Sequence, residues 1–263
     1  MLNILVCVKQ VPDVNLVKID PETGSLIRQG VPSILNPNDS NALEAAVQVK
    51  EQYGGHVTCI TMGPDMAEEA LRECLAAGAD EAVLLSDRAF ANADTLATSY
   101  VIVSAAKTLG KFDLIFCGKE SLDGATGQMG SQLAERFGAA QLSSMSLIKG
   151  IDQEKGTVTV ERELEKGIET AMATLPCLFT VEKTNYHPRI PNLKSWKASR
   201  TQEIDKYNFL SLKLDPEQVG DPGSPTKVPR TYPPESGEAG LILDEGSTEK
   251  NVSKLLELLK PQF

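Results

Sequence analysis

A loop between an apolar run and a helix-like run is the stretch best suited to bind a ligand. Residues 114–117 (LIFC) are short and apolar, and residues 128–137 have helical composition. The loop between them combines small residues, which leave the backbone open, with side chains that can donate hydrogen bonds: Gly124, Thr126, Gly127 and Gln128. Such a loop presents free N–H groups and the positive end of the helix dipole to an anion. The sequence therefore favours a phosphate group here, from a nucleotide or a flavin.

The loop matches neither of two well-defined phosphate motifs. No Gly-Lys-Ser/Thr closes it as in a Walker loop, and it lacks the GxGxxG dinucleotide pattern. A crossover loop whose glycines only turn the chain therefore stays open as an alternative.

Other catalytic chemistry is sparse in this chain. The only two histidines, His56 and His187, fall in a predicted strand and a predicted turn, so a Ser-His-Asp or Cys-His site has no convincing base. No His/Cys cluster has the spacing of a metal site. We therefore assign no catalytic residue and no metal ligand, and expect any redox chemistry to come from a bound cofactor.

Strand-like and helix-like segments alternate up to residue 138. Strands are predicted at residues 3–8, 56–62, 81–86 and 114–117, and helices at residues 36–53, 65–77, 94–109 and 128–137. This alternation predicts an α/β fold with a parallel sheet, right-handed crossovers and helices on both faces. Ligands of such sheets bind outside the carboxyl ends of the strands. Residues 9–13, 62–63 and 118–128, with the helix start at 36–39, should therefore meet on one rim.

The pattern changes after residue 138. Strands at 144–150, 157–163 and 169–174 predict an added β-hairpin, and 178–181 reads as a final apolar strand. Near the start of the chain, 17–20 and 26–29 flank a hairpin-like turn at 21–24.

The C-terminal third has an unusual composition. Residues 183–200 contain five basic and no acidic residues, together with Trp196, the only tryptophan. Residues 215–246 are rich in proline and glycine and cannot build a core by themselves. An amphipathic helix follows at 249–259. We expect this arm to dock on another subunit; packing back onto its own domain is the alternative.

Net charge and cysteine usage narrow the class of protein. A formal charge of −10 over 263 residues disfavours nucleic acid or an anionic membrane as a partner. The apolar run at residues 2–8 is too short for a signal peptide or a membrane span. The five cysteines form no CxxC pair, which fits a reducing compartment. We expect a cytoplasmic protein without membrane insertion.

A series of motifs, in order along the chain, resembles the small (β) subunit of electron-transferring flavoproteins. The resemblance runs from Leu2 to about Trp196 and is weaker beyond. It rests on VCVKQVPD (Val6–Asp13), Asn36-Pro37, Met62-Gly63-Pro64, GADEAV (Gly78–Val83), CGKESLDGATGQMG (Cys117–Gly130), VERELEKGIET (Val160–Thr170), Leu175-Pro176 and PRIPNLKSWKA (Pro188–Ala198).

The resemblance implies a Rossmann-like, adenine nucleotide alpha hydrolase-like domain paired with a larger α subunit that carries FAD. Housekeeping members hold AMP in the β site. Electron-bifurcating members hold a second FAD there, which takes a hydride from NADH. One electron then goes to ferredoxin or flavodoxin, and the other passes through the α-subunit flavin to a dehydrogenase, of the acyl-CoA or 2-hydroxyacid type. Such a chain works as part of an NADH-dependent oxidoreductase complex and not alone.

Two features favour the bifurcating type, and hence FAD over AMP. They are KQVPD at residues 9–13 and the compact loop at residues 123–128, where AMP-binding relatives carry a longer insertion. Residues 125–127 depart in detail from the bifurcating pattern, which leaves the contacts with the flavin ring open.

The resemblance also carries site roles to matching positions. Thr126, Gly127 and Gln128 would hold the pyrophosphate. Cys7, Asn36, Asp39 and Met62 match positions around the adenosine, and Lys9, Val11 and Asp123 would lie nearer the flavin ring. Gly118, Gly124, Ala125 and Met129 complete the expected binding set.

Three segments follow from these expectations. Residues 1–200 form the nucleotide-binding domain. Residues 183–200 match the family's recognition loop, which docks on a partner dehydrogenase; a loop that only covers its own sheet is the alternative. Residues 201–263 form an arm whose helix docks on the α subunit.

Overall fold

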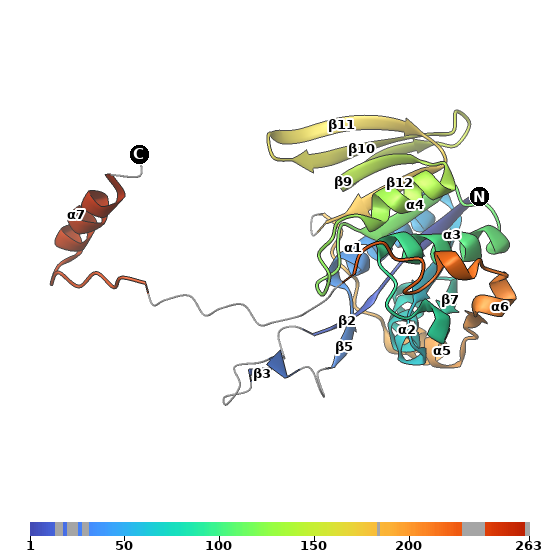
Figure 1. Cartoon of the computed structure of the whole chain (residues 1–263). Helices are drawn as coiled ribbons and strands as arrows, with labels where there is room; N and C mark the ends of the chain where they lie inside the picture. The colour runs from blue at the N-terminus through green and yellow to red at the C-terminus, as the bar shows by residue number, and fades with distance from the viewer. Residues whose placement is uncertain (14–17, 20–25, 28–31, 183–184, 228–239, 261–263) are drawn as a thin grey trace.

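The computed structural model describes residues 1–13, 18–19, 26–27, 32–182, 185–227 and 240–260 of the chain. A nine-stranded sheet runs through the body of the molecule in the order β11-β10-β9-β12-β8-β1-β6-β7-β13 (Figure 1). Its strands are β1 (Leu2–Cys7), β6 (Gly55–Met62), β7 (Glu81–Leu85), β8 (Leu114–Gly118), β9 (Ala140–Asp152), β10 (Thr157–Leu164), β11 (Gly167–Thr174), β12 (Cys177–Val181) and β13 (Asp205–Tyr207).

The centre of the sheet is parallel. Strands β12, β8, β1, β6, β7 and β13 all pair with their neighbours in the same direction. Every residue of β8 and β12 is buried, as expected for strands covered on both faces, which read as continuous apolar runs. The predicted parallel α/β sheet is confirmed.

Helices cover both faces of the sheet, and side chains alternate between two cores. On one face, α1 (Pro37–Tyr53) and α2 (Glu68–Ala77) pack with Ile4 and Val6 of β1. On the other, α3 (Thr95–Leu109) and α4 (Met129–Phe137) pack with Leu5 and Cys7 of the same strand. Because successive strand residues point to opposite faces, one apolar strand contributes to both cores.

The added β-hairpin is present and belongs to the main sheet. Strands β9, β10 and β11 are antiparallel neighbours. The start of β9 pairs parallel with β12, so this strand begins at Ala140 and not at residue 144 as the composition suggested. Its first residues mix polar and apolar types, and only the pairing with β12 makes them a strand.

Two small sheets lie beside the main one. Strand β2 (Gln10–Pro12) pairs with β5 (Ser33–Leu35), and β3 (Lys18–Ile19) pairs with β4 (Leu26–Ile27). The latter pair confirms the predicted hairpin strands; the predicted turn between them lies outside the described residues.

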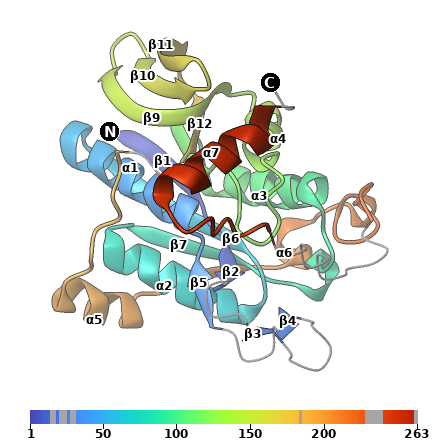
Figure 2. The same ribbon diagram turned by 90° about the vertical axis from the view of Figure 1, so that its left-hand side faces the viewer.

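The body continues past residue 200, which the sequence pattern did not indicate. Helix α5 (Leu193–Thr201) lies beside α2 in Figure 1 and Figure 2. Strand β13 then pairs with β7, and α6 (Phe209–Leu212) and a 3₁₀ turn, η4 (Pro216–Gln218), follow. Leu214 and Val219 are buried in the core around α3.

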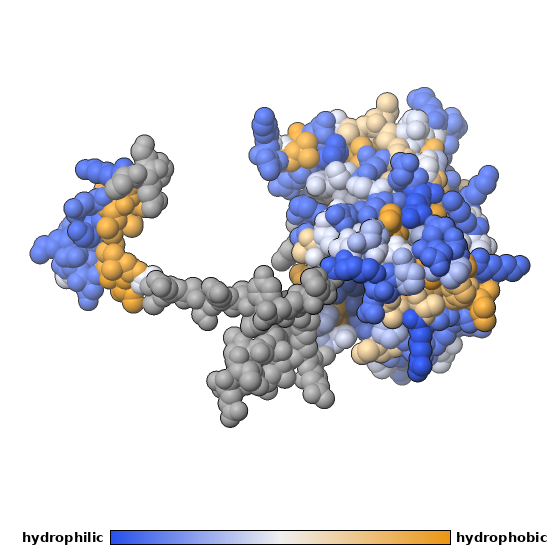
Figure 3. Space-filling view, viewed as in Figure 1, coloured by the Kyte–Doolittle hydropathy of each residue, from blue (hydrophilic) through white to orange (hydrophobic). Residues whose placement is uncertain are grey.

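The predicted C-terminal helix is confirmed as α7 (Thr248–Leu259). Figure 1 shows it apart from the body, and Figure 3 shows hydrophobic residues gathered along one side of it. Among the described residues, no helix is both long enough and apolar enough to cross a membrane.

Candidate functional site

The carboxyl ends of β8, β1 and β6 lie side by side at one edge of the sheet. Cys7, the last residue of β1, pairs with Cys117 on one side and with Ile60 on the other. The loops that follow these strands therefore meet on one rim, as the βα alternation predicted. The start of α1 reaches the same rim through the side chains of Asn36 and Asp39.

Asp39 joins the ends of two strands. Its Oδ2 accepts a hydrogen bond from the backbone N–H of Lys9 at 2.8 Å, and its Oδ1 accepts one from the N–H of Gly118 at 2.8 Å. A Cβ at Gly118 would collide with Asp39 Oδ1. Burial raises the pKa of Asp39 to about 7, although the hydrogen bonds from Gly118, Asn36 and Lys9 oppose the shift.

Asn36 and Asn38 hold the loop that follows β8. The Nδ2 groups of Asn36 and Asn38 donate to the carbonyl oxygen of Glu120 at 3.0 and 3.1 Å, and Asn36 Oδ1 accepts from the N–H of Leu122 at 3.2 Å. Asn36 occupies the N-cap position of α1, yet its side chain makes no capping bond to that helix. Its amide is used instead to fix the neighbouring loop.

An ion pair spans the front of the rim. Lys9 Nζ lies 2.8 and 2.7 Å from the two carboxylate oxygens of Asp123. Burial acts to raise the pKa of Asp123, but hydrogen bonds from Lys9 and Ser121 outweigh it and hold this pKa below its ordinary value. The pair therefore stays charged and ties the loop to the end of β1.

The glycine-bearing loop leaves a row of backbone amides unused. Ala125 and Gly127 both have positive φ, 46° and 62°, and residues 122–128 are exposed. Ala125 donates its N–H to Ser121 at 2.8 Å. Within the described part of the chain, no acceptor takes the N–H groups from Thr126 to Met129, where α4 begins. A Cβ at Gly127 would meet nothing within 4 Å, so the loop is open to solvent.

The remaining predicted residues are less accessible. Cys7 and Val11 are buried, at 6% and 1% exposure, and burial is the main cause that raises the pKa of the Cys7 thiol. Asn36 and Asp39 are buried too. The structure thus places these four residues beneath the rim, where Asn36 and Asp39 act through the loop they hold. Their predicted contact with an adenosine stays a prediction.

Met62 borders a hollow that the sequence did not indicate. It is the last residue of β6, and residues of the 3₁₀ turns η2 (Asp65–Ala67) and η3 (Arg88–Phe90) line the same hollow. The hollow has a volume of about 550 Å³ and is lined by Met62, Gly63, Pro64, Asp65, Ser86, Asp87, Arg88, Phe90 and Ala91. The glycine-bearing loop at residues 118–128, called the phosphate-type loop below, does not line this hollow, so the hollow extends the rim towards β7.

Thr95 is a residue of the site that the sequence did not indicate. Its hydroxyl donates to Gln128 Oε1 at 3.0 Å and accepts from Gln132 Nε2 at 3.1 Å. A threonine at the start of one helix carries no signal of this contact, because α3 and α4 meet only in the folded chain.

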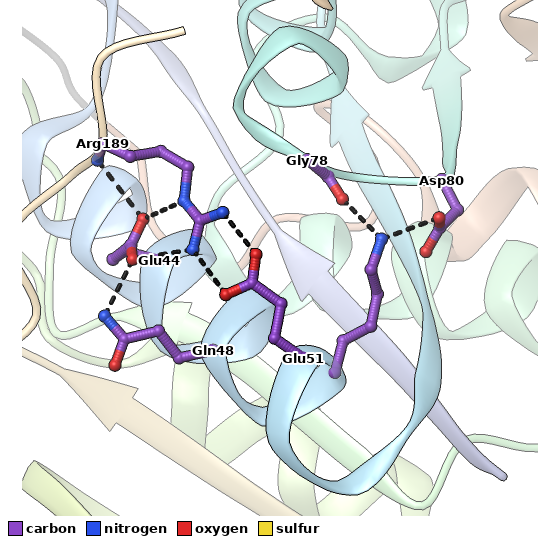
Figure 4. Close-up of polar contacts among 7 residues, drawn as sticks. Glu44, Gln48, Glu51, Gly78, Asp80 and Arg189 are labelled. Atoms are coloured by element: carbon purple, nitrogen blue, oxygen red, sulfur yellow. Dashed lines mark hydrogen bonds and ion pairs between the residues drawn. The ribbon is translucent and has the colours of Figure 1, made fainter.

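The predicted recognition loop is partly helical in the structure. Asn192 caps α5 by accepting a hydrogen bond from the N–H of Ser195. Arg189 binds both Glu44 and Glu51 on α1 (Figure 4), with its Nε 2.8 Å from Glu44 Oε2 and its Nη1 2.6 Å from Glu51 Oε1. Three apolar side chains of the segment remain exposed: Ile190, Leu193 and Trp196.

No group of three or more His, Cys, Asp or Glu side chains within the described ranges is arranged to hold a metal ion. The polar donors of the rim include the open amide N–H groups of residues 126–129 and the ammonium group of Lys9. Such a donor set suits an anion.

Comparison with known proteins identifies the family. The electron transfer flavoprotein domain model matches residues 23–211. An electron transfer flavoprotein subunit beta of Thermoanaerobacterium thermosaccharolyticum is 45% identical over 98% of both chains. Subunit CarD of the caffeyl-CoA reductase-Etf complex of Acetobacterium woodii is 44% identical over 98% of both chains. Protein FixA of Azotobacter vinelandii is 40% identical over 95% of this chain and 91% of its own. The chain therefore belongs to the electron transfer flavoprotein family, as a beta-type subunit.

Proposed function

We propose that this chain binds the diphosphate of FAD on the backbone amides of residues 126–129, as the small subunit of an electron-bifurcating flavoprotein complex. The observation that carries the proposal is the run of open backbone N–H groups at the start of α4. No acceptor among the described residues takes a hydrogen bond from them. Open N–H groups at a helix N-terminus, together with the helix dipole, favour binding of an anion such as a phosphate.

The residues present fit a diphosphate. The two positive φ values at Ala125 and Gly127 turn the backbone outward, and the absence of a side chain at Gly127 leaves room for a close approach. Lys9 is half-exposed and contributes a positive charge at the same rim. The hollow beside Met62, about 550 Å³, offers space on this rim for a ring system.

The chain's own residues position the ligand. Asp39 holds the ends of β1 and β8 in one geometry through its two backbone hydrogen bonds. Asn36 holds the loop after β8, and the pair of Lys9 and Asp123 closes it. Because these contacts lie within the chain itself, they hold the amides in a fixed arrangement, which favours binding.

A flavin held there would take a hydride from NADH and pass single electrons to ferredoxin or flavodoxin and, through the FAD of the alpha subunit, to a partner dehydrogenase. One relative supports this proposal, since CarD is a subunit of a caffeyl-CoA reductase-Etf complex. The compact loop at residues 123–128 favours FAD over AMP. An acyl-CoA or 2-hydroxyacid dehydrogenase is the partner class we propose.

The exposed apolar surfaces suit two partner contacts. In α7, Val252, Leu255 and Leu256 are all about half exposed or more, at 50%, 46% and 57%, which suits docking on the alpha subunit. Residues 188–197 expose the apolar side chains of Ile190 and Trp196 and carry the basic residues Lys194 and Lys197. That mixture suits a transient contact with an acidic dehydrogenase surface. We place the complex in the cytoplasm, where the five buried thiols would stay reduced.

Counting flavins in the purified complex tests the proposal. The expected result is two FAD molecules for each alpha–beta pair, one of which NADH bleaches. One FAD and one AMP would instead make the protein a non-bifurcating carrier with the same phosphate site. A complex without any nucleotide in this chain would overturn the phosphate assignment itself.

A further inference from the structure

A chain of side-chain hydrogen bonds ends at the phosphate-type loop. Gln132 Nε2 donates to Thr95 Oγ1 at 3.1 Å, and Thr95 Oγ1 donates to Gln128 Oε1 at 3.0 Å. Gln128 is the residue immediately before α4, and its side chain belongs to the exposed loop. This series of hydrogen bonds therefore leads from the contact between α3 and α4 to the loop where we propose that the ligand binds.

The direction of these hydrogen bonds determines whether the oxygen or the NH₂ group of the Gln128 side chain is free. A threonine hydroxyl has one proton, and here it accepts from Gln132 Nε2 and donates that proton to Gln128 Oε1. Gln128 then uses its oxygen and keeps both N–H bonds for another partner. Gln132 Oε1 is buried and has no partner in the described part of the chain. With Gln132 reversed, the orphan would be a buried NH₂, and orphaned donors are rarer in proteins than orphaned carbonyls.

Thr95 itself is firmly placed. It is the first residue of α3 and follows the N-cap Asp94, whose side chain accepts from the N–H groups of Leu96 and Ala97. Asp94 is held in turn by Ser224 and Thr226 from the C-terminal segment of the body.

One turn along α3, a second contact fixes α4. Arg136 Nε donates to Ser99 Oγ at 3.0 Å, and the Arg136 guanidinium lies over the ring of Tyr100, 5.5 Å from its centroid. The hydroxyl of Thr95 thus has a defined position, whereas Gln128, exposed at the loop, has no other described hydrogen bond to orient its side chain.

We infer that Thr95 is a positioning residue for the ligand's phosphate: its hydroxyl orients the Gln128 amide so that the NH₂ group, and not the oxygen, serves the anion. This inference rests on the proposed phosphate site. It adds a residue from outside the loop, on a different helix, to the set that determines affinity.

The first test compares three variants of the whole complex after its exchangeable nucleotide has been removed. Thr95→Val keeps the shape and removes the hydroxyl, Thr95→Ser restores it, and Ser99→Ala removes the matched hydroxyl of the Arg136 contact. The apo complex is titrated with FAD and, separately, with AMP. Thr95→Val should weaken binding about tenfold, the size of one lost hydrogen bond to a charged group. Thr95→Ser and Ser99→Ala should bind like the wild type.

A double-mutant cycle separates positioning from structure. Gln128→Ala should weaken binding about as much as Thr95→Val, and the combined variant should lose little more, because the hydroxyl acts through Gln128. Gln128→Glu, which places a carboxylate where the NH₂ is, should bind more weakly than Gln128→Ala.

If the losses of affinity in Thr95→Val and Gln128→Ala are additive, or if Gln128→Glu and Gln128→Ala bind equally well, the inference is overturned. The proposed function stands in either case, provided that the wild type binds the nucleotide. A wild-type complex that binds neither FAD nor AMP would overturn the proposed function instead. Comparable thermal midpoints for Thr95→Val and Ser99→Ala would show that a difference in affinity between them does not come from unfolding.

Discussion

Asp39 Oδ1 accepts a hydrogen bond from the backbone N–H of Gly118 at 2.8 Å, which joins the first turn of α1 to the end of β8. The two residues stand 79 positions apart in the chain. Their contact sets where the loop after β8 begins, and hence where the amides of α4 face the rim. The same contact governs two of the outcomes we expect.

The pH dependence of stability should carry a contribution from Asp39. Its pKa is raised from 3.8 to about 7, so the folded state binds its proton more tightly than the unfolded state. The resulting stabilisation is fully present below about pH 4 and is lost as the pH rises through about 7. Urea unfolding of the wild type and Asp39→Asn between these limits measures it. The stability of the wild type relative to the variant should fall by a few kcal/mol as the pH rises. A constant difference across this range would contradict the raised pKa.

Gly118→Ala should destabilise the fold and displace the loop. The added Cβ would collide with Asp39 Oδ1 and crowd Asn38, and overpacking of this kind costs about 1–3 kcal/mol. Gly150→Ala, in β9 and outside the expected binding set, is the control, because its Cβ would meet nothing within 4 Å. The measurements are the thermal midpoint of each variant and the amount of nucleotide that its purified complex retains. Equal behaviour of the two variants would show that the close approach at Gly118 is not needed.

Lys9→Met should weaken nucleotide binding with little effect on stability. The Lys9–Asp123 pair is half-exposed, and exposed pairs contribute about 0–1 kcal/mol to folding. Its removal frees the loop and takes a positive charge from the rim. Lys119→Met breaks a pair of similar exposure with Glu182, 2.8 Å away, and should leave affinity unchanged. Titration with FAD at low and high salt distinguishes the two; identical affinities would remove Lys9 from the site.

Arg189→Gln should loosen the basic segment. Arg189 donates to Glu44, whose side chain is only 7% exposed, and to Glu51, and the hydrogen bonds from Arg189 are the main cause that lowers the pKa of Glu51. Leaving Glu44 buried without its cation should cost about 3 kcal/mol. Urea unfolding gives that cost, and hydrogen exchange of residues 190–198 should accelerate. Arg200→Gln, which breaks the more exposed pair with Glu69, serves as the control. Unchanged exchange in Arg189→Gln would mean that other contacts, such as the hydrogen bonds from Arg72 to Ser199 and Gln202, are sufficient to hold α5.

A chain that ends at residue 227 should fold normally and fail to assemble. The apolar side chains of α7 are exposed, so removing them subtracts nothing from the core of the body. Co-purification with the alpha subunit and thermal unfolding of the shortened chain check the two halves of this expectation. Stable assembly without α7 would place the subunit contact elsewhere, and a large loss of thermal stability would favour packing of the arm on its own domain.

Local patterns in the sequence were sufficient for the parallel sheet and its helices. The continuous apolar runs of β1 and β8 report burial on both faces, and glycines such as Gly54 and Gly78 mark where α1 and α2 end. Because crossovers of one hand bring the carboxyl ends of parallel strands to one edge, the loops of the site could also be placed on a common rim. The open amides of the loop from Gly124 to Gln128 were likewise indicated by composition.

Only the tertiary structure decided which distant side chains meet, at the rim and in the basic segment. Asp39 with Gly118, Thr95 with Gln128, and Arg189 with Glu44 are contacts between residues 33 to 145 positions apart. The short strand β13 exists only because β7 offers it an edge to pair with. Such contacts depend on where whole elements pack, and a local pattern of residue types carries no information about distant partners.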